Sequence, residues 1–216
     1  MSERKTFWES RREFLDKKIK LERYQKIGVL LLVIVLSGFA GWLWEFCLQE
    51  VSGGFQGLYI KGGNLSPWIN IYAYGAVLII GTTYRLRKNP WLVFLVSAVV
   101  CGVLEGLAGW LVYSIFDGAR YWNYLNSWWG FGSINGFVCP VSVIAFGLAA
   151  VALIYWALPW CIHVARTMSK RAFLIMTISL FSAVMVDDVV NLILKSMDLP
   201  TAMNLYESWG WQYRSK

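Results

Sequence analysis

Four acidic side chains lie within or at the end of long apolar stretches, where an ionised group is costly. Glu105 is the fifteenth residue of a 25-residue apolar stretch, and Glu45 stands near the end of an earlier one. Asp187 and Asp188 are neighbours about two-thirds of the way along a third. Carboxyl groups in such places bind cations, carry protons or act as general acids, so these four are the candidate functional acids.

The helical spacing of the last stretch adds an amide to this set. Asn191 follows Asp187 by four residues and Asp188 by three, which places it on the same helical face as at least one of them. Because adjacent helical residues point about 100° apart, one of the two aspartates is expected to be structural. Structural roles also stay open for Glu45, which can reach the outer headgroups, and for Glu105, which can bond a neighbouring Trp, Tyr or Ser.

An aromatic segment with one arginine, R-Y-W-N-Y-L-N-S-W-W-G-F, occupies 120–131. It is either an interfacial aromatic belt or a folded lid over an outward-facing pocket. In the second interpretation, Arg120 pairs with Glu105 or Glu45. Aromatic faces beside carboxylates suit a lipophilic cation. The aromatic side chains of this lid and pocket would be Trp122, Tyr124, Trp128, Trp129, Trp42, Trp44 and Trp110.

Membrane helices are needed to position these residues. Apolar and aromatic residues make up 57% of the 216 residues, and charged residues only 15%, against about 25% in a soluble domain. This composition excludes an ordinary soluble globule and a disordered chain. Five stretches are each long enough to cross a hydrocarbon core of about 30 Å. The predicted fold is an all-α polytopic bundle with spans at 27–48, 67–84, 91–115, 138–161 and 172–194.

Basic residues set the expected orientation, since Lys and Arg collect on the cytoplasmic side. Fifteen of them fall in 1–26 and in the loops at 85–88 and 166–171, and five fall on the other face. The N-terminus is therefore predicted inside and the tail, 196–216, outside, in what we expect to be a bacterial cytoplasmic membrane. Residues 5–25 are predicted to form a basic amphipathic helix on the lipids of the inner leaflet, as an anchor or as a docking site for a cytoplasmic partner.

An internal repeat predicts how the spans are grouped within the transmembrane domain, 27–195. V-L-S-G-F-A-G-W-L-W-E at 35–45 and V-L-E-G-L-A-G-W-L-V-Y at 103–113 agree at seven of eleven positions. Two spans per copy predict two parallel repeat units, about 27–84 and 91–161, related by an axis along the membrane normal. The Gly-x-Ala-Gly runs would let the repeated helices approach closely. A chance agreement between two apolar sequences is the alternative.

A series of short motifs runs through 35–150. They are Gly41-Trp42-Leu43-Trp44-Glu45, Ser66-Pro67 with Ile71-Tyr72-Ala73-Tyr74-Gly75, Glu105 with Gly109-Trp110-Leu111, Arg120-Tyr121-Trp122-Asn123-Tyr124 and Asn135-Gly136. These motifs resemble G-W-x-x-E, G-P-x-x-P-I-Y-G, E-x-x-x-G-W-L-x-E, R-x-W-D-Y and N-G-R, the patterns of the ABC-transporter type IV, or CmpB-like, family of small polytopic membrane proteins. Tyr113 stands in place of a Glu of that family, Asn123 in place of an Asp and Phe137 in place of an Arg. The resemblance implies the fold of the family with a retuned charge network.

No cofactor and no metal are expected. The four cysteines, Cys47, Cys101, Cys139 and Cys161, lie in or at the ends of apolar spans without C-x-x-C spacing, which is typical of packing residues. His163 is the one histidine in the sequence, too few for a zinc site of the usual kind. Basic residues of the leader are interleaved with acids, which argues against nucleic-acid binding.

The function that fits these features best is that of a transporter or a substrate-binding membrane subunit. Its substrate would be a small lipophilic or cationic molecule held where Glu45, Glu105 and one of the aspartates share a site with Arg120. The sequence has no G-x-x-x-x-G-K-[ST] motif, so ATP would require a separate cytoplasmic ATPase subunit. The basic leader and the loop at 85–88 are where such a subunit would dock.

The second function class is an intramembrane enzyme acting on a lipid-soluble prenyl or terpenoid substrate. Asp187-Asp188-Val189-Val190-Asn191 has the D-D-x-x-N spelling of Mg²⁺-diphosphate prenyl enzymes. Trp44-Glu45-Phe46 loosely resembles small membrane-bound terpene cyclases, in which a protonated carboxyl starts ring closure. In such an enzyme, the four acids named first would be catalytic. A purely structural or immunity-type membrane protein is the third class.

Overall fold

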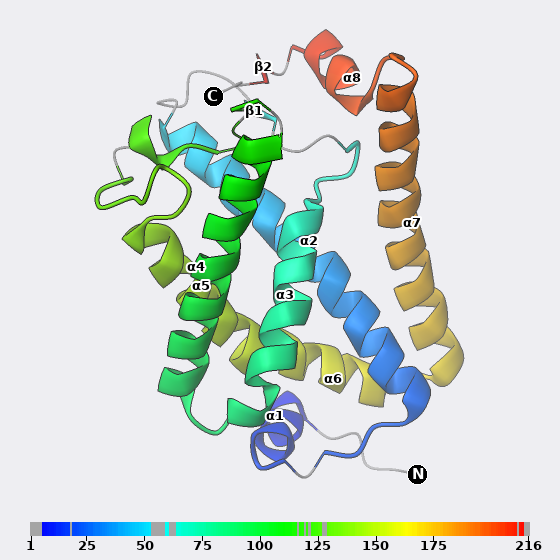
Figure 1. Cartoon of the computed structure of the whole chain (residues 1–216). Helices are drawn as coiled ribbons and strands as arrows, with labels where there is room; N and C mark the ends of the chain where they lie inside the picture. Colours follow the sequence, from blue (N-terminus) through cyan, green and yellow to red (C-terminus); the bar gives the residue numbers. More distant parts are fainter. Residues whose placement is uncertain are drawn as a thin grey trace. The chain divides into compact units, whose positions relative to one another are not determined.

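The computed structural model of the chain describes residues 6–17, 19–52, 59–60, 64–115, 117–118, 120, 122–126, 129–210 and 212–213. Most of these residues are helical, as Figure 1 shows. The chain divides into two compact units, each of which contains one copy of the sequence repeat. Unit 1 comprises Met1–Thr6, Lys20–Val77 and Cys161–Ser215, and unit 2 comprises Phe7–Ile19, Leu78–Trp160 and Lys216.

Unit 1 is organised around two long apolar helices. These helices, α2 (Arg23–Ser52) and α7 (Lys170–Ser196), pack along each other. Ser169 caps the start of α7, because its hydroxyl accepts a hydrogen bond from the amide of Ala172. The other elements are the first part of α3 (Asn70–Thr83), the last part of α6 (Leu158–Thr167), α8 (Ala202–Ser208) and the parallel strand pair β1 (Tyr59–Ile60) and β2 (Gln212–Tyr213).

The segment that leads into α3 packs directly on the backbone of α2. The Trp68 indole is 2% exposed, and its Nε1 donates to the carbonyl of Val35 at 3.1 Å. The next amide, that of Ile69, donates to the carbonyl of Gly38 at 3.1 Å. Trp68 also contacts Val184 of α7 in a buried cluster. The core of unit 1 therefore joins α2, α7 and the start of α3.

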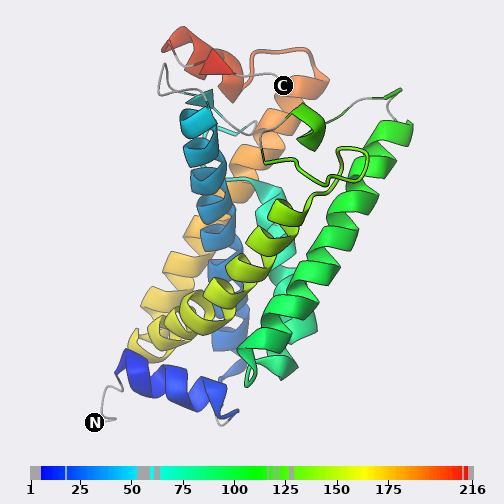
Figure 2. The ribbon, with the colours of Figure 1, turned by 90° about the vertical axis from the view of Figure 1, so that its left-hand side faces the viewer.

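Unit 2 is organised around the helix pair α4 (Pro90–Ile115) and α5 (Pro140–Ala152), which lie side by side in Figure 2. Each helix begins with a proline. Proline is tolerated there because the first backbone amides of a helix have no partner within the helix. Asn89 caps α4 through its side-chain oxygen, and Cys139 and Ser142 form a capping box on α5. The other elements are α1 (Phe7–Leu15), the short turns η1 (Tyr84–Leu86) and η2 (Tyr124–Asn126), and a π segment, η3 (Leu153–Ala157), that joins α5 to α6.

The two copies of the repeat make the same kind of close contact, each inside its own unit. A Cβ at Gly41 of α2 would meet the ring of Tyr72, and a Cβ at Gly109 of α4 would meet Phe137. Both aromatic rings come from the segment that follows the repeated helix in the chain. Each repeat glycine thus makes room for a ring of its own unit, and the predicted close approach of the two repeated helices to each other stays a prediction.

The all-α membrane fold is confirmed. In the described part of the chain, four helices are long and apolar enough to cross a membrane, namely Arg23–Leu48, Pro90–Ile115, Pro140–Thr167 and Lys170–Ser196. The span predicted at 67–84 is instead the 14-residue helix α3, which is about 21 Å long at 1.5 Å per residue. It is shorter than expected because Pro67 and the buried Trp68 hold the first part of the stretch outside the helix.

The amphipathic helix predicted over 5–25 is wrong in its length. The helix α1 ends at Leu15, and Lys17 then adopts the left-handed conformation with a φ of 61°. The chain turns here because the carbonyl of Phe14 accepts a hydrogen bond from Arg87 Nε at 2.8 Å. The Phe14 side chain is fully buried. One face of α1 therefore packs on unit 2 itself.

Leucine at either repeat glycine is expected to destabilise the protein by about 1–3 kcal/mol, because the space is filled by an aromatic ring. Gly41→Leu should cost more than Gly109→Leu, since a Cβ at Gly109 lies 3.0 Å from Phe137 whereas one at Gly41 overlaps Tyr72. Gly75→Leu is the matched control, because no described atom lies within 4 Å of a Cβ there. Thermal unfolding in detergent is the measurement, and equal midpoints for all three variants would contradict this packing.

Candidate functional site

Glu105 is held by one hydroxyl group on each of its carboxylate oxygens. Tyr124 Oη donates to Glu105 Oε1 at 2.6 Å, and Ser142 Oγ donates to Glu105 Oε2 at 2.7 Å. Glu105 lies within α4, Ser142 in the first turn of α5, and Tyr124 in the loop between these helices. The half-buried carboxylate therefore joins three segments of unit 2.

The position of Ser142 follows from the start of α5. Ser142 Oγ accepts the amide of Cys139 at 3.2 Å, and Cys139 Sγ accepts the amide of Ser142 at 3.4 Å. This reciprocal cap fixes the hydroxyl at the helix N-terminus, where the backbone dipole favours a nearby negative charge. The carboxylate of Glu105 is therefore stabilised by both a hydroxyl and a helix end.

The position of Tyr124 follows from a turn in the aromatic loop. Asn135 and Gly136 both have positive φ, of 51° and 76°, which is the backbone of a tight Asn-Gly hairpin turn. The carbonyl of Gly136 accepts the amide of Tyr124 at 3.0 Å, and the carbonyl of Phe137 accepts Trp122 Nε1 at 2.8 Å. These bonds fold the loop back over the helix pair, as a lid over Glu105 requires. Trp128, another predicted lid residue, lies outside the described residues.

The phenol of Tyr124 stays a hydrogen-bond donor at physiological pH. Burial raises the pKa of Tyr124 above its ordinary value of 10.0, and the negative charge of Glu105 raises it further. A neutral phenol is the form that can donate to a carboxylate. The phenol of Tyr124 can therefore donate to Glu105 at neutral pH.

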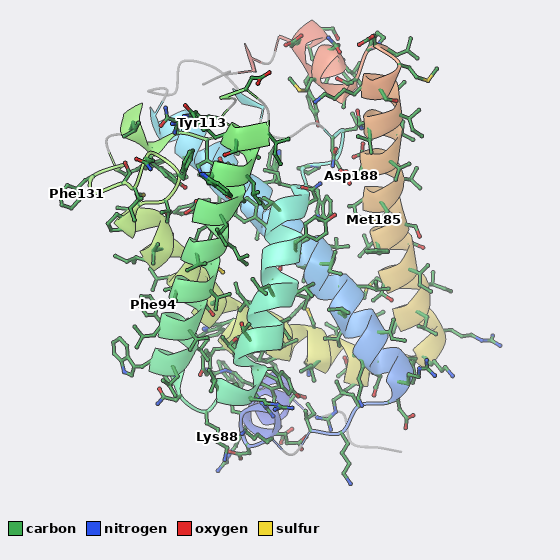
Figure 3. All side chains as sticks on the ribbon, in the orientation of Figure 1. Lys88, Phe94, Tyr113, Phe131, Met185 and Asp188 are labelled. Carbon is green, nitrogen blue, oxygen red and sulfur yellow. The ribbon has the colours of Figure 1, made fainter. Side chains whose placement is uncertain are left out.

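Arg120 lies in the same loop and is sandwiched between two aromatic rings. Its guanidinium carbon is 4.8 Å from the ring centre of Tyr113 and 4.7 Å from that of Phe137. Its Nη1 donates to the carbonyl of Asn135 at 2.7 Å. Figure 3 shows Tyr113 at the loop end of α4. The arginine thus stabilises the loop through cation–π contacts, and its pairing with Glu105 stays a prediction.

Glu45 belongs to unit 1 and accepts a hydrogen bond from a phenol. Tyr72 Oη donates to Glu45 Oε1 at 2.7 Å, which ties α2 to α3. Glu45 and Tyr113 occupy the same position of the two repeats. In unit 2, a contact between two aromatic rings takes the place of this hydrogen bond. The ring centres of Tyr113 and Phe137 are 5.7 Å apart.

The tryptophans predicted on the repeated helices differ in their surroundings. Trp42 stacks on Phe46 with ring centres 5.3 Å apart, along one face of α2. Trp44 of α2 and Trp110 of α4 are about half exposed, at 50% and 54%. Membership of these three rings in a binding site stays a prediction.

Asp187 forms a clasp between α7 and the segment before α3. Its Oδ1 accepts the amide of Leu65 at 3.0 Å and Asn191 Nδ2 at 2.7 Å. Its Oδ2 accepts the amide of Ser66 at 2.6 Å and also the Ser66 hydroxyl. Four donors engage the two carboxylate oxygens, which fits the expectation that one of the paired aspartates is structural.

The neighbouring polar groups extend this clasp. Asp188 Oδ1 accepts Asn64 Nδ2 at 3.1 Å, and Figure 3 shows Asp188 on α7. Asn191 Oδ1 accepts the amide of Ala202 at 2.9 Å, which attaches the start of α8. The three polar residues of the D-D-x-x-N motif therefore make hydrogen bonds within unit 1. No group of three metal-ligating side chains occurs among the described residues.

Arg87, one of the three basic residues of the loop at 85–88, is 4% exposed. It donates to the carbonyls of Phe14 and Tyr84, and its guanidinium stacks on both of their rings. It is therefore occupied within unit 2 and is not available to a docking subunit. Arg85 and Lys88 of the same loop are exposed.

The predicted site residues thus fall into separate groups. Unit 2 brings Glu105 together with Tyr124, in the loop that also holds Arg120 and Trp122. Unit 1 holds two groups, which are Glu45 with Tyr72 and the clasp around Asp187. A single site that unites acids from both units stays a prediction.

Sequence reasoning missed the hydroxyl partners of these acids, namely Ser142, Tyr72 and Ser66. Hydroxyl residues are common in membrane helices, so their presence alone carries little signal. A usable signal existed for Ser142 and Ser66, because each lies within two residues of a proline near the beginning of a predicted span. The first backbone amides of a helix that begins at a proline have no partner within the helix. A nearby carboxylate can accept their hydrogen bonds.

An α-helical integral membrane protein with hydrogen-bonded carboxylates in its helices is the class that the fold and the site define. The pattern of the family described as "Putative ABC-transporter type IV" matches residues 32–192, and the chain belongs to this family. This match confirms the resemblance of the motifs. No match was found among curated proteins or among solved structures. The rings that flank Arg120, those of Tyr113 and Phe137, are two of the three departures from the family motifs.

Removal of the clasp carboxylate should strongly destabilise the protein. Asp187→Ala leaves the donors of Leu65, Ser66 and Asn191 without their acceptor, which should cost about 2–3 kcal/mol. Asp188→Ala is the matched control, because it removes one contact and should cost about 1 kcal/mol or less. Thermal unfolding of both variants is the measurement. An equal loss for the two would show that Asp187 is not the centre of the clasp.

Proposed function

We propose that this protein is a membrane transporter, or the substrate-binding membrane subunit of one, and that Glu105 recognises its substrate. The observation that carries the proposal is the bonding of Glu105 by a membrane helix on one side and by an extramembrane loop on the other. A charged side chain at the centre of a membrane helix costs at least about 2.5–3.5 kcal/mol, so its retention calls for a function. Hydroxyl donors reduce this cost without neutralising the charge.

The proposed substrate is a small lipophilic or cationic molecule. The carboxylate supplies negative charge, Tyr124 supplies an aromatic ring in contact with it, and the partly buried Trp122 lies in the same loop. Aromatic faces beside an acid attract an organic cation and exclude a hydrated metal ion. In this proposal, the loop with Tyr124 is the lid, and a substrate that reaches Glu105 replaces the phenol as its partner.

A separate ATPase subunit is part of the same proposal. Membership of the ABC-transporter type IV family supports it, and the sequence itself has no phosphate-binding loop motif. Exposed basic side chains at Arg85 and Lys88 and the outer face of α1 form the docking surface we propose. Because Arg87 is buried, its substitution would act on the fold rather than on docking.

Binding of tetraphenylphosphonium, a lipophilic cation, to the purified full-length protein in proteoliposomes tests the proposal. The wild-type protein should bind it saturably, and Glu105→Gln should weaken binding about tenfold or more, equivalent to about 1.4 kcal/mol. Glutamine keeps the size and the acceptor oxygen of the side chain, so the thermal midpoint should change little.

Glu207→Gln is the matched control, because Glu207 is an exposed acid of α8 and its loss changes the net charge equally. It should bind the probe as the wild type does. Unchanged binding by Glu105→Gln, or an equal loss in both variants, would overturn the assignment of Glu105.

A further inference from the structure

The helix that continues from α5 has a carbonyl without its usual donor. Pro159 is the second residue of α6 and has no backbone N–H, so the carbonyl of Tyr155, four residues earlier, lacks the amide that an α-helix supplies. Arg11 of α1 fills this place, because its Nε donates to Tyr155 O at 2.9 Å. The short leader helix is thus attached to the membrane helix at a defined point.

Two tryptophan rings fix the guanidinium of Arg11 in place. Its central carbon lies 5.8 Å from the ring centre of Trp8 and 5.3 Å from that of Trp156. The two indoles contact each other edge to face, with centres 6.1 Å apart. Both rings remain well exposed, at 60% and 55%. The guanidinium is therefore oriented before any ligand arrives.

The Nη edge of this guanidinium is open. Among the described residues, the hydrogen bond of Arg11 uses Nε alone, and the indole N–H groups of Trp8 and Trp156 have no partner. A guanidinium edge with two parallel N–H groups matches two oxygens of a phosphate. Exposed indoles beside it offer apolar faces for the upper part of an acyl chain.

The depth of this cluster matches the headgroup region of a membrane. Trp156 follows Pro140, the first residue of the candidate span Pro140–Thr167, by sixteen residues, which is about 24 Å along a helix against a hydrocarbon thickness of about 30 Å. Tryptophan is enriched at this level. The leader, 1–26, carries nine basic and five acidic residues, so the local charge favours an anionic lipid.

We propose that Arg11, Trp8 and Trp156 form a binding site for the phosphodiester headgroup of an anionic phospholipid. The two Nη groups bind the phosphate oxygens, while Nε keeps its bond to Tyr155. A bound lipid then ties α1 to the membrane helix at the point where Pro159 interrupts it. The site is independent of Glu105.

The test measures binding of phosphatidylglycerol to the full-length protein in detergent by native mass spectrometry, with phosphatidylcholine as the neutral comparison. The wild-type protein should prefer phosphatidylglycerol. Arg11→Ala should raise its dissociation constant about tenfold or more, a change equivalent to about 1.4 kcal/mol. Arg12→Ala is the matched control, since Arg12 is the exposed next residue and its loss changes the net charge equally. It should retain the wild-type affinity.

Trp8→Leu keeps the proposal testable if Arg11→Ala unfolds, because it leaves the bond to Tyr155 intact and removes one ring. It should weaken phosphatidylglycerol binding at least about twofold, consistent with the modest energy of one exposed cation–π contact. Equal losses of affinity in Arg11→Ala and Arg12→Ala would show that binding depends on net charge alone, and would overturn the site. Displacement of the lipid by millimolar inorganic phosphate would likewise overturn it, in favour of a free-phosphate site.

Discussion

A carboxylate inside an apolar helix bundle needs hydrogen-bond donors, and this requirement organises both units of the protein. In unit 1, Asp187 collects donors from the segment before α3 and from its own helix. In unit 2, Glu105 accepts hydrogen bonds from hydroxyls of α5 and of the loop between α4 and α5. In each case, the acid is on a long membrane helix and its partners are on segments that would otherwise be loosely attached. Because a buried carboxylate needs hydrogen-bond donors, each acid also fixes the position of the segment that supplies them.

The two acids differ in the kind of donor that holds them. Asp187 accepts hydrogen bonds from four donors, two of which are backbone amides. A ligand that took the place of these donors would leave the two amides unpaired. Glu105 is bonded by two side-chain hydroxyls that can rotate away. The first arrangement is suited to a fixed structural clasp and the second to an exchangeable ligand site. Sequence position alone made the two acids look alike.

The membrane class and the long helices could be predicted, because apolar length is visible in the residues themselves. The functional roles of the acids stay predictions. The motifs also pointed correctly to the family, whose pattern matches residues 32–192. Details set by tertiary contacts could not be predicted. The burial of Phe14 shortened the leader helix, and the packing of Trp68 on α2 shortened the span at 67–84. Arg87 resembled a docking charge until its hydrogen bonds and ring contacts were known.

The central claim is that the carboxylate of Glu105 holds the loop between α4 and α5 through Tyr124. A double-mutant cycle with Glu105→Ala, which removes the acceptor oxygens, and Tyr124→Phe measures this coupling directly, through the free energy of unfolding of the single and double variants in mixed micelles. Coupling energies between hydrogen-bonded side chains in membrane proteins average about 0.6 kcal/mol and reach about 1.7 kcal/mol. Because the acceptor is a carboxylate, the structure predicts a value of about 1 kcal/mol or more. Additive effects of the two substitutions, with no coupling, would contradict the account.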